Sequence, residues 1–512
     1  MTVRSRVQGM PGAGAVSWRK NARFARMSHL ALLVSVSCLL LFFDLGVRVL
    51  ATNDETRFPV LARDILAHGH WLLPRLNGAP HLNKPPLHAW LIAFASWPLG
   101  SVTQASAAIP SLLAALGVVL ATWWIAKWLF GAAVATVAGL VVVTTYGVFT
   151  LARVPMPDMT FCAAVTAALA AYAAAEVAGR GGALVAFYLL VGVAVWTKGP
   201  PGLLPLAVAI FDVLTTYGRA GLRRLVSTPG LVLLGLLVLP WWLLAAAAGQ
   251  GGFLREIVIT DWLLWYVPAA GEWRALSEPL AQALTILLPW SLALPVALWA
   301  LSRRPTDAAR ARRLRLIVLW AATVFVAVAV SHQQRMRYYL PLCPPAAVLI
   351  AVWWADLRVP RRTMAFGGVW VLVAVGLGVW HVQAAARYNA ATELQAVLEA
   401  LRGCRAPVYA VEVPELVFTF YLERPVAWRA TYGDVEASLD EGPAYLIIAD
   451  RALPASLTSS HLRQVATGRL LRRPLSVFAD DRGSCGGPPA VGSDGRPLAR
   501  RPHAGWAPAG DA

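Results

Sequence analysis

Hydrophobic residues form long runs along most of the chain, and several runs reach the ~20 residues that a membrane-spanning helix needs. Basic residues mark many of the ends, because Lys and Arg gather in the cytoplasmic loops of membrane proteins. Runs and basic loops together predict about eleven spans and a cytoplasmic N-terminus. The predicted spans are Ser28–Arg48, Ala105–Trp128, Ala132–Leu151, Met159–Ala178, Ala183–Trp196, Gly199–Thr216, Pro229–Ala248, Leu280–Leu301, Leu316–Ser331, Tyr338–Ala355 and Thr363–Ala384.

One apolar run, Leu87–Gly100, is too short for a span, since it offers only about 14 apolar residues. If it did cross the membrane, the later basic loops would lie outside, against the positive-inside rule. We therefore expect it to lie at the interface, as part of an external loop over residues 51–104. Arg335 and Arg337 then form the one dense arginine cluster on the external side.

The composition agrees with a polytopic membrane protein, because 58% of the residues are hydrophobic and 14% are charged, against about 25% charged in soluble domains. A net charge of +18 would suggest nucleic acid in a soluble protein. Here basic cytoplasmic loops and attraction to anionic membrane lipids explain it better, so we expect no nucleic-acid partner. Residues 1–28 are predicted to be a basic cytoplasmic tail and residues 29–384 the membrane domain.

The C-terminal region is less hydrophobic and predicts a small external α/β domain over residues 385–480. Residues 390–401 have a helical pattern, and residues 407–413 and 444–450 have the β-branched and aromatic enrichment of strands. Residues 481–512 are rich in Gly, Pro and Arg and are predicted to be disordered. Cys404 and Cys485 both fall in this region, and they either form a disulfide or remain free thiols. The fold class is therefore an α-helical membrane protein with a small soluble α/β domain.

A polar stretch, residues 54–86, interrupts the apolar pattern and is the first candidate for a functional site. Asp54 and Glu55 lie just beyond a predicted span, where a carboxylate could serve as a general base; the alternative is the solvated first turn of a helix. Lys84 precedes two prolines that fix its backbone, so its ammonium suits a phosphate ligand; the alternative is an interfacial lysine. Four cations share the stretch: Arg57, Arg63, Arg75 and Lys84. An amphipathic helix is predicted from the spacing of Phe58, Leu61, Ala62, Ile65 and Leu66.

Other polar residues are predicted on the same face of the membrane. Asp158 begins a span beside Arg153, either as part of a site or as half of a surface ion pair. For Lys198 a helix-end position at the interface is the favoured explanation. The external cluster of Arg335, Arg337, Tyr338 and Tyr339 suits either an anionic phosphate or lipid headgroups. The histidines predict no metal site, so a divalent metal has no support from ligand spacing.

Five stretches carry a resemblance to a known family: DETRFPVLARDIL, GHWLLPRLNGAPHLNKPPLHAWL, RVPMPDMTF, WTKGPPGLL and RMRYYLPLCPP. Over about residues 30–355 the chain resembles the lipid A 4-amino-4-deoxy-L-arabinose transferases. It is similar, more distantly, to protein O-mannosyltransferases of the same GT-C superfamily. The resemblance implies a GT-C fold with interfacial helices in the first external loop.

The resemblance also implies inverting transfer of a sugar from a polyprenyl-phosphate donor to a lipid or glycan acceptor, on the outer face of the bacterial inner membrane. By resemblance Asp54 is the base or orients the acceptor, with Glu55 beside it, and Asp158 supports the site. The donor phosphate would be held by Arg57, Lys84, Arg335, Arg337, Tyr338 and Tyr339.

Two departures from the family leave the substrates open. Asn83 stands where the family often has an acid before the lysine, and the stretch REIVITDWLLWYVP lacks a histidine that the family often carries. Both weaken the expectation of a metal and leave the sugar and acceptor unnamed. Three alternatives remain: a protein O-glycosyltransferase, a membrane transporter or lipid flippase, and a non-catalytic protein that binds anionic lipid.

Overall fold

The computed structural model describes residues 29–480, apart from gaps at 177–178, 180–181, 250–251, 254, 256–257, 260–276, 332, 360, 403–405, 441, 450–452, 454–456 and 458–460. The predictions for residues 1–28 and 481–512, and for Cys404 and Cys485, lie outside the described residues. The chain divides into two compact units, Met1–Leu50 with Asp54–Asn389 and Ala51–Asn53 with Ala390–Ala512.

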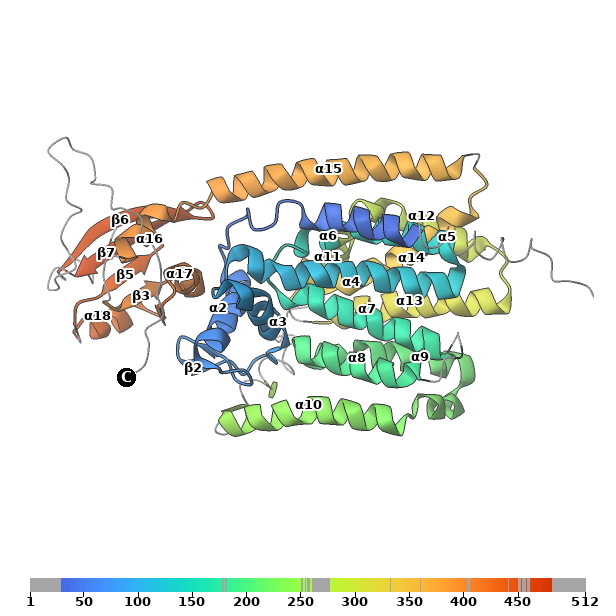
Figure 1. The fold of residues 1–512 in the computed structure, drawn as a ribbon, viewed down its shortest axis with the longest axis horizontal. Helices are drawn as coiled ribbons and strands as arrows, with labels where there is room; N and C mark the ends of the chain where they lie inside the picture. The colour runs from blue at the N-terminus through green and yellow to red at the C-terminus, as the bar shows by residue number, and fades with distance from the viewer. Residues whose placement is uncertain are drawn as a thin grey trace, which may run out of the picture. The chain divides into compact units, whose positions relative to one another are not determined.

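The first unit is a bundle of helices that run side by side (Figure 1). Within the described residues, six segments are long and apolar enough to cross a membrane: α4 (Gln104–Phe130), α7 (Pro157–Glu176), η2 with α9 (Pro200–Tyr217), α10 (Thr228–Ala248), η7 with α14 (Met336–Asp356) and α15 (Arg362–Ala390). Further helices are His29–Phe42, α2 (Asn53–His68), α3 (Leu87–Ser96), α5 (Ala132–Val143), α6 (Tyr146–Leu151), α8 (Ala183–Lys198), η3 (Arg219–Leu225), α11 (Ser277–Ile286), α12 (Leu294–Arg303) and α13 (Ala308–Ala329), with the short 3₁₀ turns η1 (Trp97–Leu99) and η6 (Trp290–Leu292). The number of about eleven spans stays a prediction.

Two predicted spans are broken, and the sequence explains both breaks. The run 280–301 becomes α11, a 3₁₀ turn and α12, because Pro289 lacks the amide hydrogen that a continuous helix needs. The run 132–151 divides into α5 and α6 at Thr144 and Thr145, whose hydroxyls donate back to the carbonyl oxygens of Leu140 and Val141 at 2.7 and 2.9 Å. Such back-bonding competes with the helical ladder and bends helices.

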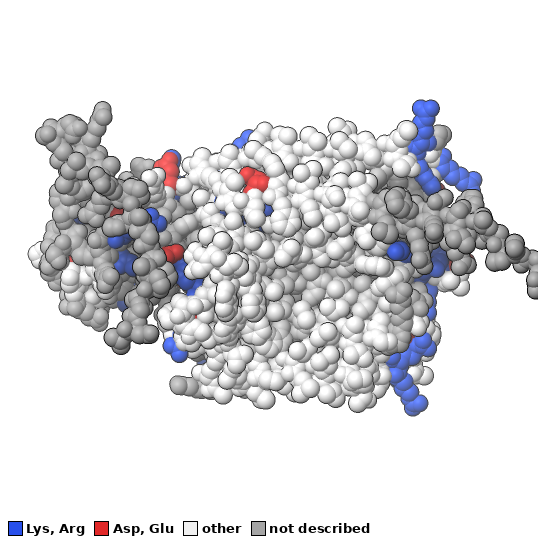
Figure 2. Space-filling view, viewed as in Figure 1, with Lys and Arg blue, Asp and Glu red and all other residues white. Residues whose placement is uncertain are grey.

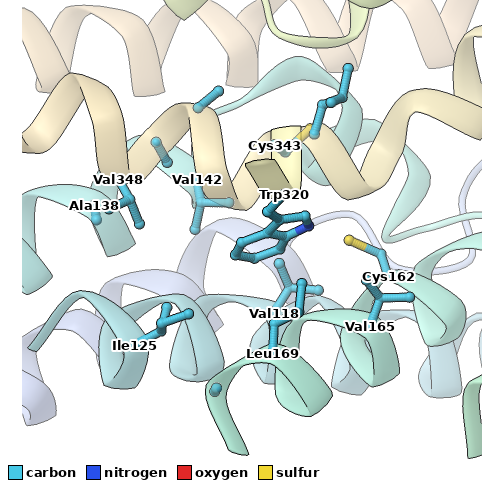
Figure 3. Close-up of a cluster of buried hydrophobic side chains, with 14 of the residues drawn as sticks. Val118, Ile125, Ala138, Val142, Cys162, Val165, Leu169, Trp320, Cys343 and Val348 are labelled. Carbon is cyan, nitrogen blue, oxygen red and sulfur yellow. The ribbon is translucent and has the colours of Figure 1, made fainter. Parts of the chain in front are cut away.

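The core of the bundle lies where α4, α7, α13 and α14 meet. Trp320 of α13 is 1% exposed and lies close to Val118, Leu169 and Cys343 from the other three helices (Figure 3). A buried indole of this size holds several helices in one register, because protein interiors are close-packed. This rigid core fixes where the helix ends lie.

The two ends of the bundle differ in composition. The helices α2 and α3 gather at the end where α7 begins and α8 ends (Figure 1). Lys and Arg side chains gather at the other end, while the flank between is largely uncharged (Figure 2). There Arg304 and Arg310 share Asp356, at 3.3 and 2.5 Å.

At ten residues α3 is roughly 15 Å long, half of what a span requires, as expected for an interfacial segment.

The second unit contains a five-stranded sheet of order β4-β3-β5-β7-β6. The strands β3 (Val408–Val411), β4 (Ala427–Arg429) and β5 (Tyr445–Ile448) are parallel, and the hairpin β6 (Leu462–Leu470) and β7 (Arg473–Asp480) joins antiparallel to β5. Helices α16 (Gln395–Arg402), α17 (Glu415–Leu422) and α18 (Tyr432–Asp440) complete it. The predicted strands at 407–413 and 444–450 contain β3 and β5, and the β6–β7 hairpin was not predicted.

Candidate active site

The polar stretch begins as the predicted amphipathic helix, α2. Its apolar positions Phe58, Leu61 and Ile65 are buried against the bundle, while Asp54 lies in the first turn. Acidic residues stabilise the first turn of a helix, because its backbone N–H groups are unsatisfied there. The helix therefore holds the Asp54 carboxylate at a defined place near the end of the bundle.

The loop after α2 is anchored by tryptophans from two other helices, α3 and α10. The indole N–H of Trp90 donates to the carbonyl oxygen of Trp71 at 2.5 Å, and that of Trp241 donates to Leu72 at 3.0 Å. Trp90 also packs on Trp196, with ring centroids 4.9 Å apart. Tryptophan suits an interfacial site, since the ring is apolar and the N–H needs a partner. These contacts hold the start of the loop that leads to Lys84.

Asp54 is surrounded by arginines from two distant parts of the chain. Its Oδ2 accepts from Arg335 at 2.7 Å and from Arg337 at 2.8 Å, and its Oδ1 lies 3.6 Å from Arg57. Burial raises the pKa of the carboxyl, but the charges of Arg337, Arg57 and Arg335 outweigh burial and hold the pKa below its usual 3.8. Asp54 is therefore ionised at neutral pH.

Asp158 is the second carboxylate of the site and is only 3% exposed. It accepts from the ammonium of Lys198 at 2.6 Å, and its other oxygen lies 3.8 Å from Nε of Arg337. The ammonium of Lys198 also lies 4.5 Å from the ring centre of Tyr338. Arg337 thus joins Asp54 to Asp158, and the two carboxylates belong to one site.

Lys84 completes a group that we call the cation cluster: Arg57, Lys84, Lys198, Arg335 and Arg337 around Asp54 and Asp158. Burial, followed by the charges of Arg57 and Lys198, lowers the pKa of Lys84 to about 8. No carboxylate among the described residues lies within ion-pair distance of its ammonium. The cations outnumber the two carboxylates by three, so the cluster is suited to a multiply charged anion.

Two predicted site residues do not join the cation cluster. Glu55 is buried and pairs with Arg48 at 2.5 Å, and it accepts from the hydroxyl of Tyr388 at 3.2 Å. Tyr339 is fully buried and donates to the side-chain oxygen of Gln334 at 2.5 Å. Glu55 directly follows Asp54, and Tyr339 directly follows Tyr338, whose ring faces Lys198. Neighbours on a helix point roughly 100–120° apart, so Glu55 and Tyr339 point away from the cluster.

Two further residues of the predicted face behave differently from expectation. Arg153 makes no ion pair with Asp158 and instead donates to backbone carbonyl oxygens of Phe43, Leu40 and Phe149. Lys198, for which the helix-end explanation was favoured, pairs directly with Asp158. The signal for Lys198 was its match to Lys84, since both lysines stand directly before a rigid proline-rich turn.

The prediction from histidine spacing also missed one group of possible metal ligands. Asp64, His68 and His70 bring three ligating atoms within 4.8 Å of one another, and this is the one such group among the described residues. It lies at the far end of α2 from Asp54. The group is therefore separate from the cation cluster and shares no residue with it.

Comparison with known proteins agrees with this fold. Residues 83–248 match the model of the family described as dolichyl-phosphate-mannose-protein mannosyltransferase. The undecaprenyl phosphate-alpha-4-amino-4-deoxy-L-arabinose arabinosyl transferase 1 of Sodalis glossinidius is 28% identical over 335 residues, covering 62% of this chain and 57% of the relative. The corresponding enzyme of Edwardsiella ictaluri is 27% identical, covering 59% and 55%. The chain thus spans less than two thirds of the length of these relatives.

Solved structures extend the likeness to nearly the whole fold. ArnT from Cupriavidus metallidurans bound to undecaprenyl phosphate aligns with a TM-score of 0.71 and 21% identity, over 90% of this chain and 99% of that chain. The oligosaccharyltransferase of Archaeoglobus fulgidus aligns with a TM-score of 0.56 and 13% identity, over 82% and 69%.

The fold is that of the GT-C glycosyltransferases, and the resemblance expected from the sequence motifs is confirmed. Within that class the chain resembles the aminoarabinose transferases in both sequence and fold.

Proposed function

We propose that the protein is a membrane glycosyltransferase that moves a sugar from a polyprenyl-phosphate donor to a lipid acceptor of the lipid A kind on the external face of a bacterial inner membrane. The observation that carries the proposal is the cation cluster, because its five cations exceed the charge of its two carboxylates and leave positive charge for a phosphate. The names of the relatives, which include undecaprenyl phosphate, support the same donor class.

The cation cluster suits the change in charge during transfer. A polyprenyl phosphate joined to a sugar is a diester with one negative charge, and the departing lipid phosphate carries about two. Fixed cations stabilise the transition state in which that second charge develops. Lys84 is the first candidate for this contact, because no carboxylate among the described residues lies within ion-pair distance of its ammonium. Arg335 is the second, since its side chain is 45% exposed.

Asp54 is the proposed base. While both arginines hold Oδ2, the carboxylate is a weak base, as its lowered pKa indicates. A donor phosphate that draws Arg335 away would leave Oδ2 of Asp54 held by Arg337 alone and would raise the basicity of the carboxylate. The acceptor hydroxyl then gives its proton to Asp54 while its oxygen bonds to the sugar, and the bond from sugar to phosphate breaks with its electron pair on the lipid phosphate.

Asp158 and Lys198 are proposed as positioning residues. Asp158 holds both Lys198 and Arg337, so it sets the direction of Arg337 toward Asp54. The two cationic partners offset the cost of burying the carboxylate, and the pairs hold all three side chains in place.

A protein O-glycosyltransferase is the second candidate function. The observation in its favour is the match of residues 83–248 to a protein mannosyltransferase family. The two candidates share the donor chemistry and differ in the acceptor. A transporter is disfavoured because the cation cluster lies where α2 and α7 begin and α8 ends, at one end of the bundle, whereas transporters place such groups near the middle of the membrane.

Deleting the gene and comparing envelope glycolipids and glycoproteins by mass spectrometry tests the proposal. The deletion strain is complemented with wild-type protein or with Asp54→Asn, which changes the first turn of α2. Lys127→Arg, in the last turn of α4, is the control variant. Loss of a pentose or hexose from one lipid, restored by wild type and the control only, supports lipid transfer. Loss from a protein identifies the second candidate, and unchanged products together with no donor consumption by purified protein overturn both.

A further inference from the structure

Three side chains with metal-binding chemistry meet where α2 ends. Asp64 and His68 are four residues apart on one face of the helix, with Oδ1 of Asp64 and Nδ1 of His68 3.1 Å apart. Gly69 follows with a φ of 71°, and its N–H donates to the carbonyl oxygen of Ile65 at 2.9 Å. This left-handed glycine turns the chain back, and Nδ1 of His70 lies 3.0 Å from Oδ2 of Asp64.

The spacing of these atoms is close to that of a tetrahedral metal site. Ligand atoms about 2.0–2.1 Å from Zn²⁺ stand roughly 3.3 Å from one another. Nδ1 of His68 and Nδ1 of His70 stand 3.1 and 3.2 Å from the same oxygen of Asp64, Oδ1, and all three ligating atoms lie within 4.8 Å of one another. The side chain of His68 is 64% exposed and can rotate to close the remaining gap. Solvent can supply a fourth ligand at this open side.

A backbone hydrogen bond from the following hairpin holds the Asp64 carboxylate in place. The backbone N–H of Arg75 donates to Oδ2 of Asp64 at 2.7 Å. Arg75 begins the short hairpin of β1 (Arg75–Leu76) and β2 (Ala79–Pro80), which leads on to Lys84. A hydrogen bond to a ligating carboxylate orients it and strengthens metal binding.

We propose that Asp64, His68 and His70 bind a divalent transition metal, with Zn²⁺ as the best match, which fixes the end of α2 to the hairpin that leads to Lys84. Imidazole nitrogens with one carboxylate are a ligand set that Zn²⁺ accepts, and Mg²⁺ or Ca²⁺ would prefer oxygen alone. Asp64 lies roughly 15 Å along the helix from Asp54, so the metal is structural and does not touch the reacting groups.

Metal binding by the purified full-length chain tests the site without any activity assay, so its outcome is independent of the proposed transferase. The protein carries a purification tag without histidine, is stripped with a chelator and is titrated with Zn²⁺ and with Co²⁺. We expect one Zn²⁺ per chain and the visible absorption of four-coordinate Co²⁺. Affinity should fall at least roughly tenfold in His70→Ala and in Asp64→Asn.

The matched control is His461→Ala, which removes an exposed histidine from the second unit and should leave binding unchanged. X-ray absorption of the wild-type zinc protein gives a reading that needs no variant, and we expect imidazole scattering from two histidines. Binding well below one metal per chain overturns the proposal, as does unchanged affinity in both ligand variants or a zinc spectrum without imidazole.

Discussion

The ionisation of Lys84 makes donor binding depend on pH in a way that can be measured. Its pKa is lowered to about 8 in the free protein, whereas a bound phosphate would raise it toward the usual 10.5. The ammonium that binds phosphate is therefore present below pH 8 and is lost as the pH rises through 8. At pH 9 roughly one molecule in eleven keeps the proton, so affinity should be about tenfold weaker than at pH 7.

The assay is equilibrium binding of a short-chain polyprenyl phosphate to protein in lipid nanodiscs between pH 7 and 9.5. The ligand itself is fully ionised over this range, since its second pKa is about 6. Lys84→Arg keeps its charge at every pH, so its binding should stay level, while Lys127→Arg should retain the wild-type slope. A level wild-type curve, or the same decline in Lys84→Arg, would refute the role of Lys84.

Three further substitutions test the structure around the site. Glu55→Gln should lower the melting temperature and leave kcat near wild type, because Glu55 pairs away from the cation cluster; a large loss of kcat with unchanged melting would contradict this. Asp158→Asn leaves two cations without their buried carboxylate, which costs ~3–5 kcal/mol in chemical unfolding and raises the KM for donor; an unchanged KM would count against it. Gly202→Ala puts a methyl group 2.2 Å from the backbone nitrogen of Val195, so we expect ~1–3 kcal/mol of destabilisation in detergent, whereas Gly117→Ala meets only one methyl at 3.8 Å and should be neutral.

Much of the helical fold could be predicted from the sequence, because apolar runs and basic loops report directly on membrane burial. The breaks in the runs were harder to predict. Proline and threonine both occur inside apolar helices, so Pro289 and the two threonines at 144–145 did not by themselves show where a helix ends. The bonds from the two threonine hydroxyls to preceding carbonyl oxygens are seen only in the structure. The β6–β7 hairpin was missed because residues 462–470 carry few strongly apolar residues and mix exposed and half-buried positions without a regular alternation.

The candidate site could be predicted as a set but not in its pairings. Asp54 and Arg335 are 281 residues apart, and topology predicted only that both lie on one face. The sequence could not show which of Asp54 and Glu55 faces the site, because adjacent residues share the same sequence neighbours. Only the directions of their side chains differ, toward Arg337 for Asp54 and toward Arg48 for Glu55. Lys198 was undervalued for a similar reason, since a lysine at a helix end is usually interfacial and only packing brings Asp158 to it.

The central claim is that Asp54 takes the acceptor proton while the cation cluster holds the lipid phosphate. The most direct test is a single-turnover measurement with purified protein, a polyprenyl-phosphate sugar and the acceptor identified by mass spectrometry. Wild type should release polyprenyl phosphate and form a product of inverted anomeric configuration. Asp54→Asn should bind the donor but slow transfer by roughly 10²–10⁴. Equal transfer rates in the two proteins, or a product of retained configuration, would contradict the account.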